Sequence, residues 1–275
     1  MNNKVAIQGI KGSFHHLVAQ EYFHEDIEVH ECLSFDKLVE SLLDKTCNMA
    51  VMAIENSIAG SIIPNYALID ANQLHVIGEY YINIHQNLMA LNGQRIEDIT
   101  EVYSHPMALL QTKEFFKQYP HIKLIEDADT AEVAQRIHEN QLKGVGAVAS
   151  YAAAKLYDLN ILGSEIQTIK NNATRFVIVQ TKNSAIPEED INKASLKFEL
   201  DHKRGSLATI LNVMSDCRMN LTKIQSLPII ETPWKYSFFV DVTFDKYSDF
   251  VKAKSVLEIM AEHFKVLGEY KNARI

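Results

Sequence analysis

The spacing of apolar and polar positions changes once along the chain, near residue 190. From residue 4 to about 180, short apolar runs alternate with helix-length amphipathic segments. From about 194 to 275 the pattern is strand, helix, strand, strand, helix, strand. Residues 182–190 between them are polar, contain Pro187 and lack apolar periodicity, as linkers do. The pattern therefore predicts a first domain over residues 1–182 and a second domain over residues 194–275.

Apolar periodicity in the first domain predicts both strands and amphipathic helices. The predicted strands are residues 5–8, 27–30, 49–54, 75–84, 102–104, 123–126, 145–149 and 176–180, and the predicted helices are residues 14–23, 35–43, 62–71, 107–118, 131–141 and 151–156. Such alternation is typical of parallel strands with helices on both faces. The run 74–91 contains two strand-like stretches that carry the chain away from the first sheet. We therefore expect two α/β lobes with a cleft between them, one from about 1–79 plus 164–182 and the other from 80–163.

The second domain is predicted to be a small α/β module. Its strands are expected at residues 195–201, 221–230, 236–244 and 264–267, with helices at 206–215 and 251–261 and a turn at Thr232-Pro233. This order is ferredoxin-like, βαββαβ. A single sheet of this kind has faces and edges that need cover, which the pairing of two copies can supply.

Composition limits the environment and the partners. The formal net charge of −8 argues against nucleic acid or an anionic membrane as partner, since both bind basic surfaces. No apolar run approaches the roughly 20 residues that span a bilayer, and the N-terminus lacks a signal-peptide pattern. Cys32, Cys47 and Cys217 lie far apart, without the spacing of a zinc or redox motif. We expect a cytoplasmic protein that holds any anionic substrate through local positive groups.

Thr174 and Arg175 lie where a polar loop becomes an apolar strand. Ligands of open α/β folds bind at strand ends, and the arginine fork pairs with a carboxylate through two hydrogen bonds. The pair is consistent with a small anionic ligand. A strand that begins with Thr and Arg on a solvated face gives the same pattern, so the pair alone does not distinguish an anion site from an ordinary strand start.

Polar residues also follow other predicted strands. Asn56 and Ser57 follow the strand at 49–54, where they either contact a ligand or end the strand and cap the next helix. Ser13 precedes a helix whose backbone N–H groups can receive an anion, although the loop lacks the spacing of a nucleotide-binding motif. Ser104 and His105 are adjacent, which does not by itself make a nucleophile and base, and we expect a Ser-capped helix there.

Several segments together resemble the prephenate dehydratase family. They are residues 9–16, 54–61, 104–106 with Gln111, and 172–176, in the order and approximate spacing of that family, with a similar small-residue helix at 148–159. The resemblance covers essentially the whole chain. It implies a two-lobed, periplasmic-binding-protein-like (type II) catalytic domain followed by an ACT regulatory domain. Since there is no room before residue 4 for a chorismate mutase domain, we expect a monofunctional carbon–oxygen lyase.

The resemblance implies decarboxylating dehydration of prephenate to phenylpyruvate, carbon dioxide and water, in L-phenylalanine biosynthesis. Thr174 corresponds to the family's catalytic threonine and would aim its O–H at the departing hydroxyl. Because a threonine hydroxyl is a weak acid, hydrogen-bond stabilisation is favoured over full proton transfer. Arg175 would clamp the carboxylate that stays, whereas tight pairing of the carboxylate that leaves would stabilise the ground state.

The resemblance further implies a set of substrate-binding residues and no cofactor. The substrate-binding candidates are Asn56, Ser57, Ser104, His105, Gln111, Phe176 and Ser13. Phe176 lies either beside the substrate ring or in the core strand. Ile10, Ser13 and His15 stand where the family usually has Pro, Thr and Ser. No metal or organic cofactor is expected, because the histidines show no HExxH-type spacing.

In the second domain the similarity to ACT domains implies an effector site. Its candidates are Gly205, Ser206 and Leu207 in the strand-to-helix loop and Asn220 and Leu221 at the next strand. The family binds L-phenylalanine there between paired subunits, so we expect feedback inhibition in a homodimer or homotetramer. Gln225 and Leu227 stand where these dehydratases usually carry Glu and Arg, which leaves the direction and sensitivity of the response open. A dimerisation module with little ligand affinity is the alternative.

Three other functions stay open. Arogenate is a possible alternative substrate, since the cleft residues alone do not separate it from prephenate. The same two-lobed architecture is also typical of solute-binding proteins, which normally are exported and lack an ACT module. The third is an amino-acid sensor with an inactive cleft, which the intact segment Thr174-Arg175-Phe176 disfavours.

Overall fold

The computed structural model describes residues 4–24, 27–182, 186–201, 203–229, 232 and 235–274. Parts of the predicted linker (residues 183–185) and of the predicted turn (Pro233), the last residue of the strand predicted at 221–230 (Ile230) and residues 1–3 lie outside the described residues. The chain forms two compact units, one of residues 1–60 and 81–176 and one of residues 61–80 and 177–275. The domain boundaries expected from the sequence stay a prediction.

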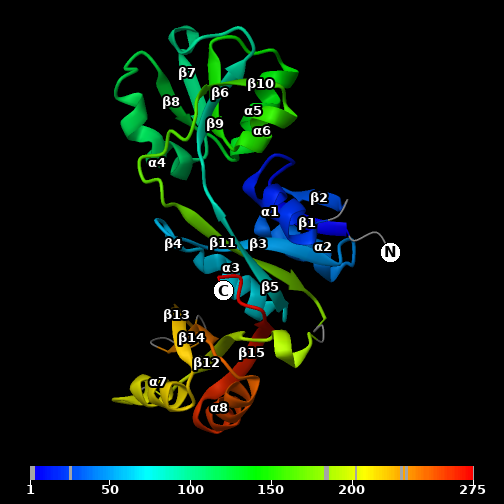
Figure 1. The fold of residues 1–275 in the computed structure, drawn as a ribbon, viewed down its shortest axis with the longest axis vertical. Coiled ribbons are helices and arrows are strands. Elements are labelled where there is room, and N and C mark those ends of the chain that lie inside the picture. The colour runs from blue at the N-terminus through cyan, green and yellow to red at the C-terminus, as the bar shows by residue number, and fades with distance from the viewer. Residues whose placement is uncertain are drawn as a thin grey trace. The chain divides into compact units, whose positions relative to one another are not determined.

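The first sheet has the strand order β2-β1-β3-β11-β5, with β4 paired to β3 (Figure 1). Its strands are β1 (Lys4–Gln8), β2 (Glu28–Cys32), β3 (Met49–Asn56), β4 (Gly60–Ser61), β5 (His75–Asn83) and β11 (Ala173–Gln180), and its helices are α1 (Phe14–Phe23), α2 (Phe35–Leu43) and α3 (Ile63–Ala71). β1 is parallel to β2 and to β3, and its central residues Val5, Ala6 and Ile7 are completely buried. The carboxyl ends of β1 and β3 therefore meet at one edge of the sheet.

The second sheet has the order β10-β6-β9-β7-β8 (Figure 1). It comprises β6 (Asn87–Leu91), β7 (Glu101–Ser104), β8 (Lys123–Glu126), β9 (Val145–Ala149) and β10 (Leu159–Gly163), with α4 (Pro106–Phe116), α5 (Thr130–Glu139), α6 (Tyr151–Leu156) and a 3₁₀ turn at Ile96–Asp98. The alternation predicted parallel strands, with the run 74–91 set apart from it, and β6 in that run is antiparallel to both of its neighbours, β9 and β10. β6 follows β5 after only residues 84–86, and this short segment carries the chain from the first sheet into the second. The two α/β sheet lobes expected from the sequence are confirmed.

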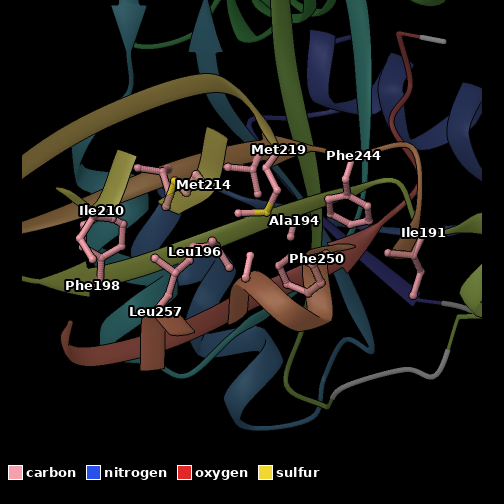
Figure 2. Close-up of a cluster of buried hydrophobic side chains, with 13 residues drawn as sticks. Ile191, Ala194, Leu196, Phe198, Ile210, Met214, Met219, Phe244, Phe250 and Leu257 are labelled. Atoms are coloured by element: carbon pink, nitrogen blue, oxygen red, sulfur yellow. The ribbon is translucent and has the colours of Figure 1, made fainter. Parts of the chain in front are cut away.

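The third sheet has the order β13-β14-β12-β15, with every pair antiparallel. The elements run β12 (Lys193–Glu199), α7 (Ser206–Asp216), β13 (Asn220–Pro228), β14 (Tyr236–Thr243), α8 (Tyr247–Met260) and β15 (Glu262–Tyr270), after a 3₁₀ turn at Glu188–Asp190. This is the expected ferredoxin-like order. Figure 2 shows the core between the sheet and its two helices, where Leu196 and Phe198 of β12 pack with Met214 of α7 and Phe250 and Leu257 of α8.

The opposite face of the third sheet packs against α3 and β5. Lys193 Nζ lies 2.9 and 2.8 Å from the two carboxylate oxygens of Glu79, and both side chains are almost completely buried. Tyr66 contacts Phe239 edge to face at 5.5 Å. A Cβ on Gly268 would lie 2.0 Å from the carbonyl oxygen of Val76, so β15 can approach β5 this closely only because residue 268 is glycine. Segments of the same chain thus cover this face.

None of the helices in the described residues combines the length and the apolar character that crossing a membrane requires. Within the same residues, no group of three or more His, Cys, Asp or Glu side chains is arranged to hold a metal ion.

Candidate active site

A hydrogen-bonded cluster joins the carboxyl end of β3 to the start of β11. The Asn56 amide nitrogen donates to Thr174 Oγ1 at 2.9 Å and to Asn172 Oδ1 at 2.7 Å. Asn56 Oδ1 accepts from the N–H groups of Ile58 and Ala59 at 3.0 and 2.9 Å, which fixes the amide plane. Because the Thr174 oxygen accepts from Asn56, the hydroxyl proton is directed toward a different acceptor.

Asn172 extends this cluster to α4 and to the end of β5. Its side chain is completely buried and donates to Gln111 Oε1 at 3.1 Å, and its carbonyl accepts from the N–H of Ile84 at 2.6 Å. The sequence did not single out Asn172 as a site residue. Its place two positions before Thr174 was visible, but its role depends on contacts with residues far away in sequence.

Ser57 closes the same junction through the backbone. The Ala173 N–H donates to Ser57 Oγ at 2.9 Å, and the Ser57 N–H donates to the Ala173 carbonyl at 2.8 Å. Neither Asn56 nor Ser57 caps the next helix, because α3 begins after Ile62 without a side-chain cap. The two residues therefore hold β11 against β3.

Thr174, Arg175 and Phe176 are all buried, with exposed fractions of 7%, 4% and 1%. β11 thus does not begin on a solvated face, which was the alternative interpretation of this segment. Phe176 packs edge to face on the His15 ring, with centroids 4.9 Å apart, so it is part of the core of the lobe. The hydroxyl of Thr174 and the guanidinium of Arg175 thus belong to adjacent, buried residues.

Ser104 and His105 lie at the end of β7 but do not face each other in a catalytic pair. Ser104 is completely buried and its Oγ donates to the Val148 carbonyl at 2.6 Å. The expected serine cap of α4 is wrong, because His105 is the cap residue and its Nδ1 accepts from the Met107 N–H at 3.2 Å. Pro106 occupies the first turn of α4. The Ser104 hydroxyl proton is thus donated to the backbone of the neighbouring strand β9 and not to a catalytic base.

The first loop is attached to α6. Ser13 caps α1 by accepting from the His16 N–H at 3.3 Å. Ser150 Oγ donates to the Gly12 carbonyl at 2.6 Å, and Tyr157 O–H donates to the Lys11 carbonyl at 2.8 Å. A Cβ on Gly12 would lie 3.1 Å from Ala153 Cα, at a backbone φ of +92°, so this contact requires glycine. Burial raises the pKa of Tyr157 to about 12, which keeps it a neutral donor.

A cavity of about 350 Å³ lies beside α1. It is lined by Phe14, Leu17, Glu21, Tyr81, Ile82, Asn83, His85, Ser150 and Tyr151. Asn83 precedes Ile84, whose N–H donates to Asn172, so chain and hydrogen bonds connect the cavity with the Thr174 cluster. Thr174 and Arg175 themselves are not among its lining residues.

The fold and this cluster define a class. Two α/β sheet lobes, with a neutral amide network, a directed hydroxyl and a guanidinium at adjoining strand ends, are typical of proteins that bind a small anion at the ends of their strands. The family described as prephenate dehydratase matches residues 5–184 of the chain. The chain therefore belongs to the prephenate dehydratase family.

Individual relatives agree with this family. An arogenate dehydratase 2 of Petunia hybrida is 39% identical over 227 residues, which are 82% of this chain and 57% of that protein. An arogenate dehydratase/prephenate dehydratase 2 of Arabidopsis thaliana is 33% identical over 277 residues, 97% of this chain and 72% of that protein. The chain thus spans somewhat more than half of the first relative and about seven tenths of the second.

Solved structures share the fold across the full length. A prephenate dehydratase of Arthrobacter aurescens in complex with L-Phe has a TM-score of 0.86 at 22% identity, over 98% of this chain and 90% of that chain. GqqA, described as a quorum quenching acylase, has a TM-score of 0.88 at 24% identity, over 98% of both chains. At such identities these likenesses show the fold alone.

Proposed function

We propose that the chain catalyses the decarboxylating dehydration of prephenate to phenylpyruvate. Family membership supports the reaction type, and the hydrogen bond from Asn56 to Thr174 carries the assignment of the site. In the reaction the ring carbon–carboxylate bond and the ring carbon–hydroxyl bond break, and the electron pair of the first completes the aromatic ring as the second leaves with the oxygen. One proton converts the departing hydroxide into water.

The directed O–H of Thr174 is suited to the departing oxygen. Asn56 orients this hydroxyl from the acceptor side, so the hydrogen bond to the leaving group costs little reorganisation when charge develops. Thr174 stabilises the leaving oxygen, and the proton itself comes from solvent or through the hydroxyl as a relay. Asn172 and Gln111 keep Asn56 in place.

Arg175 is proposed to hold the carboxylate that stays. Its burial places the guanidinium in an environment of low dielectric, where pairing with a carboxylate is strong. Arg175→Leu is expected to raise KM by roughly 10- to 100-fold with a smaller change in kcat, because a charge-assisted hydrogen bond contributes about 1.5–3 kcal/mol. Steady-state kinetics on the folded variant checks this. Arg175→Lys, which keeps the charge but not the fork, should lie between, and a wild-type KM in both variants would place the anchor elsewhere.

One assay tests the reaction itself. Purified protein is incubated with prephenate and, in parallel, with arogenate, and phenylpyruvate and phenylalanine are measured. We expect turnover of prephenate. Arogenate is included because the petunia relative carries that activity in its name. Turnover of arogenate without turnover of prephenate would show that arogenate is the substrate. If folded protein converts neither compound, the proposal is overturned.

We further propose that the ferredoxin-like domain is an ACT domain that binds L-phenylalanine near the start of α7. Gly205, at φ +86°, begins this helix. A cavity of about 130 Å³ beside it is lined by Leu200, Asp201, Lys203, Ser206, Leu207, Lys235, Tyr236 and Phe238. Groups of both charge signs next to aromatic side chains suit a zwitterionic aromatic amino acid. Asn220 and Leu221 begin β13, which is an edge strand and can pair with a second copy, so we propose a homodimer or homotetramer.

Calorimetry with L-phenylalanine tests the effector. We expect saturable binding to the wild-type protein and inhibition of turnover over the same concentrations. Gln225 carries an amide, whose nitrogen donates to the backbone carbonyl of Ser226 at 2.9 Å, and it therefore has no carboxylate to offer a ligand ammonium group. Binding is therefore expected to be weaker than in a protein with Glu at this position. If no heat of binding is measured at millimolar phenylalanine, the domain serves for association of subunits and does not bind this effector.

We also propose a cytoplasmic location, which the free thiols of Cys32, Cys47 and Cys217 support.

A further inference from the structure

His15 is a buried imidazole on α1. It is 8% exposed and lies in the second position of the helix, after the Ser13 cap and Phe14. A polar ring inside the lobe needs hydrogen-bond and ring contacts that offset the cost of its burial. These contacts lead to both strands that carry the candidate active site.

The first contact is a hydrogen bond to β3. The Ala53 N–H donates to His15 Nε2 at 3.3 Å, three residues before Asn56 on the same strand. An imidazole that accepts at Nε2 and stays neutral carries its proton on Nδ1. Burial lowers the pKa of His15 to about 3, so the ring keeps this acceptor throughout the neutral range.

The second contact is with β11. The His15 ring meets Phe176 edge to face, with centroids 4.9 Å apart and an interplanar angle of 89°, and it meets Phe35 of α2 at 5.6 Å. Phe176 follows Thr174 by two residues, so both side chains point to the same face of the strand. β3 and β11 are neighbours in the sheet. His15 therefore touches both strands on which Asn56 and Thr174 meet.

We propose that His15 is a positioning residue for the dehydration, which fixes β3 relative to β11 and thereby sets the Asn56–Thr174 hydrogen bond. The inference rests on the proposed function of Thr174. His15 does not touch the reacting atoms. It acts through Ala53 and Phe176 on the direction of the Thr174 hydroxyl, where a displacement of a fraction of an ångström weakens the contact with the leaving oxygen.

The test uses three substitutions at His15 in the full chain. His15→Phe keeps an edge-to-face ring but removes the acceptor, His15→Leu removes both, and His15→Gln keeps an acceptor at the distance of Nε2. We expect kcat to fall at least about tenfold in the Phe and Leu variants, with KM within about twofold, and to recover largely in the Gln variant. Val18→Ala, a buried substitution on the same helix, is the control for a general loss of stability.

A double-mutant cycle with Thr174→Ala separates positioning from packing. If His15 acts through Thr174, His15→Leu should lose most of its effect on kcat in the Thr174→Ala background. Additive losses, or a wild-type kcat in folded His15→Phe and His15→Leu, would overturn the inference. If Thr174→Ala alone leaves kcat unchanged, the proposed role of Thr174 fails instead, and a kcat loss in the His15 variants then argues against a route through this hydroxyl.

Discussion

Thr174→Ala is expected to lower kcat by about 10²- to 10³-fold while KM changes by less than about threefold. Removing one donor aimed at developing negative charge costs this much in other oxyanion sites, because the donor acts in the transition state and hardly in the ground state. In the wild-type protein Asn56 orients the Thr174 hydroxyl. Arg175, the next residue along the chain, is unchanged in this variant and still binds the remaining carboxylate. Steady-state kinetics with prephenate gives both constants.

Two further variants make this result specific. Thr174→Ser keeps the hydroxyl and should retain kcat within about tenfold. Thr112→Ala removes another completely buried threonine hydroxyl, one that donates within α4 to the Ala108 carbonyl, and should leave kcat unchanged. A Thr174→Ala enzyme that turns over like the wild type would show that the leaving oxygen has a different donor. Equal losses in Thr174→Ala and Thr112→Ala would point to general destabilisation.

The elements of the chain could be predicted where local signals agree. The helices at 14–23, 35–43 and 151–156 have their predicted bounds, because Ser13, Ser34 and Ser150 each cap an apolar-periodic run. β10 was missed, since a five-residue strand with a mostly half-buried pattern shows no clear alternation. The direction of β6 could not be predicted, because it depends on the route of the chain between two sheets.

The site could be predicted only as a set of positions. Asn56 and Thr174 were recognisable at strand ends, but their hydrogen bond joins residues 118 apart in sequence. Such a contact follows from the order of strands in the sheet, which no local pattern specifies. The contacts of Asn172 could not be predicted for the same reason. Nor could the hydrogen bond by which Ser57 holds the Ala173 backbone. His15 was visible only as a departure from the usual residue, without the contacts that give it a role.

A contact of the same long-range kind predicts the largest effect on stability. Lys193→Met is expected to lower the free energy of unfolding by about 3 kcal/mol, because it leaves the Glu79 carboxylate buried without its lysine counter-charge. The two side chains are 4% and 0% exposed, and both carboxylate oxygens contact the ammonium group. Nothing in the sequence pattern around Glu79 on β5 or Lys193 on β12 indicated this pair.

Urea unfolding followed by circular dichroism measures the effect. Lys252→Met is the matched control, since Lys252 is largely exposed beside Asp249 in the same domain and should change the stability by less than about 0.5 kcal/mol. The double variant Lys193→Met with Glu79→Leu removes both charges at similar volume and should recover much of the loss, because an apolar pair avoids the cost of desolvating two ions. If the double variant is as unstable as Lys193→Met, the loss comes from packing at Lys193 and the buried charge of Glu79 is not its cause.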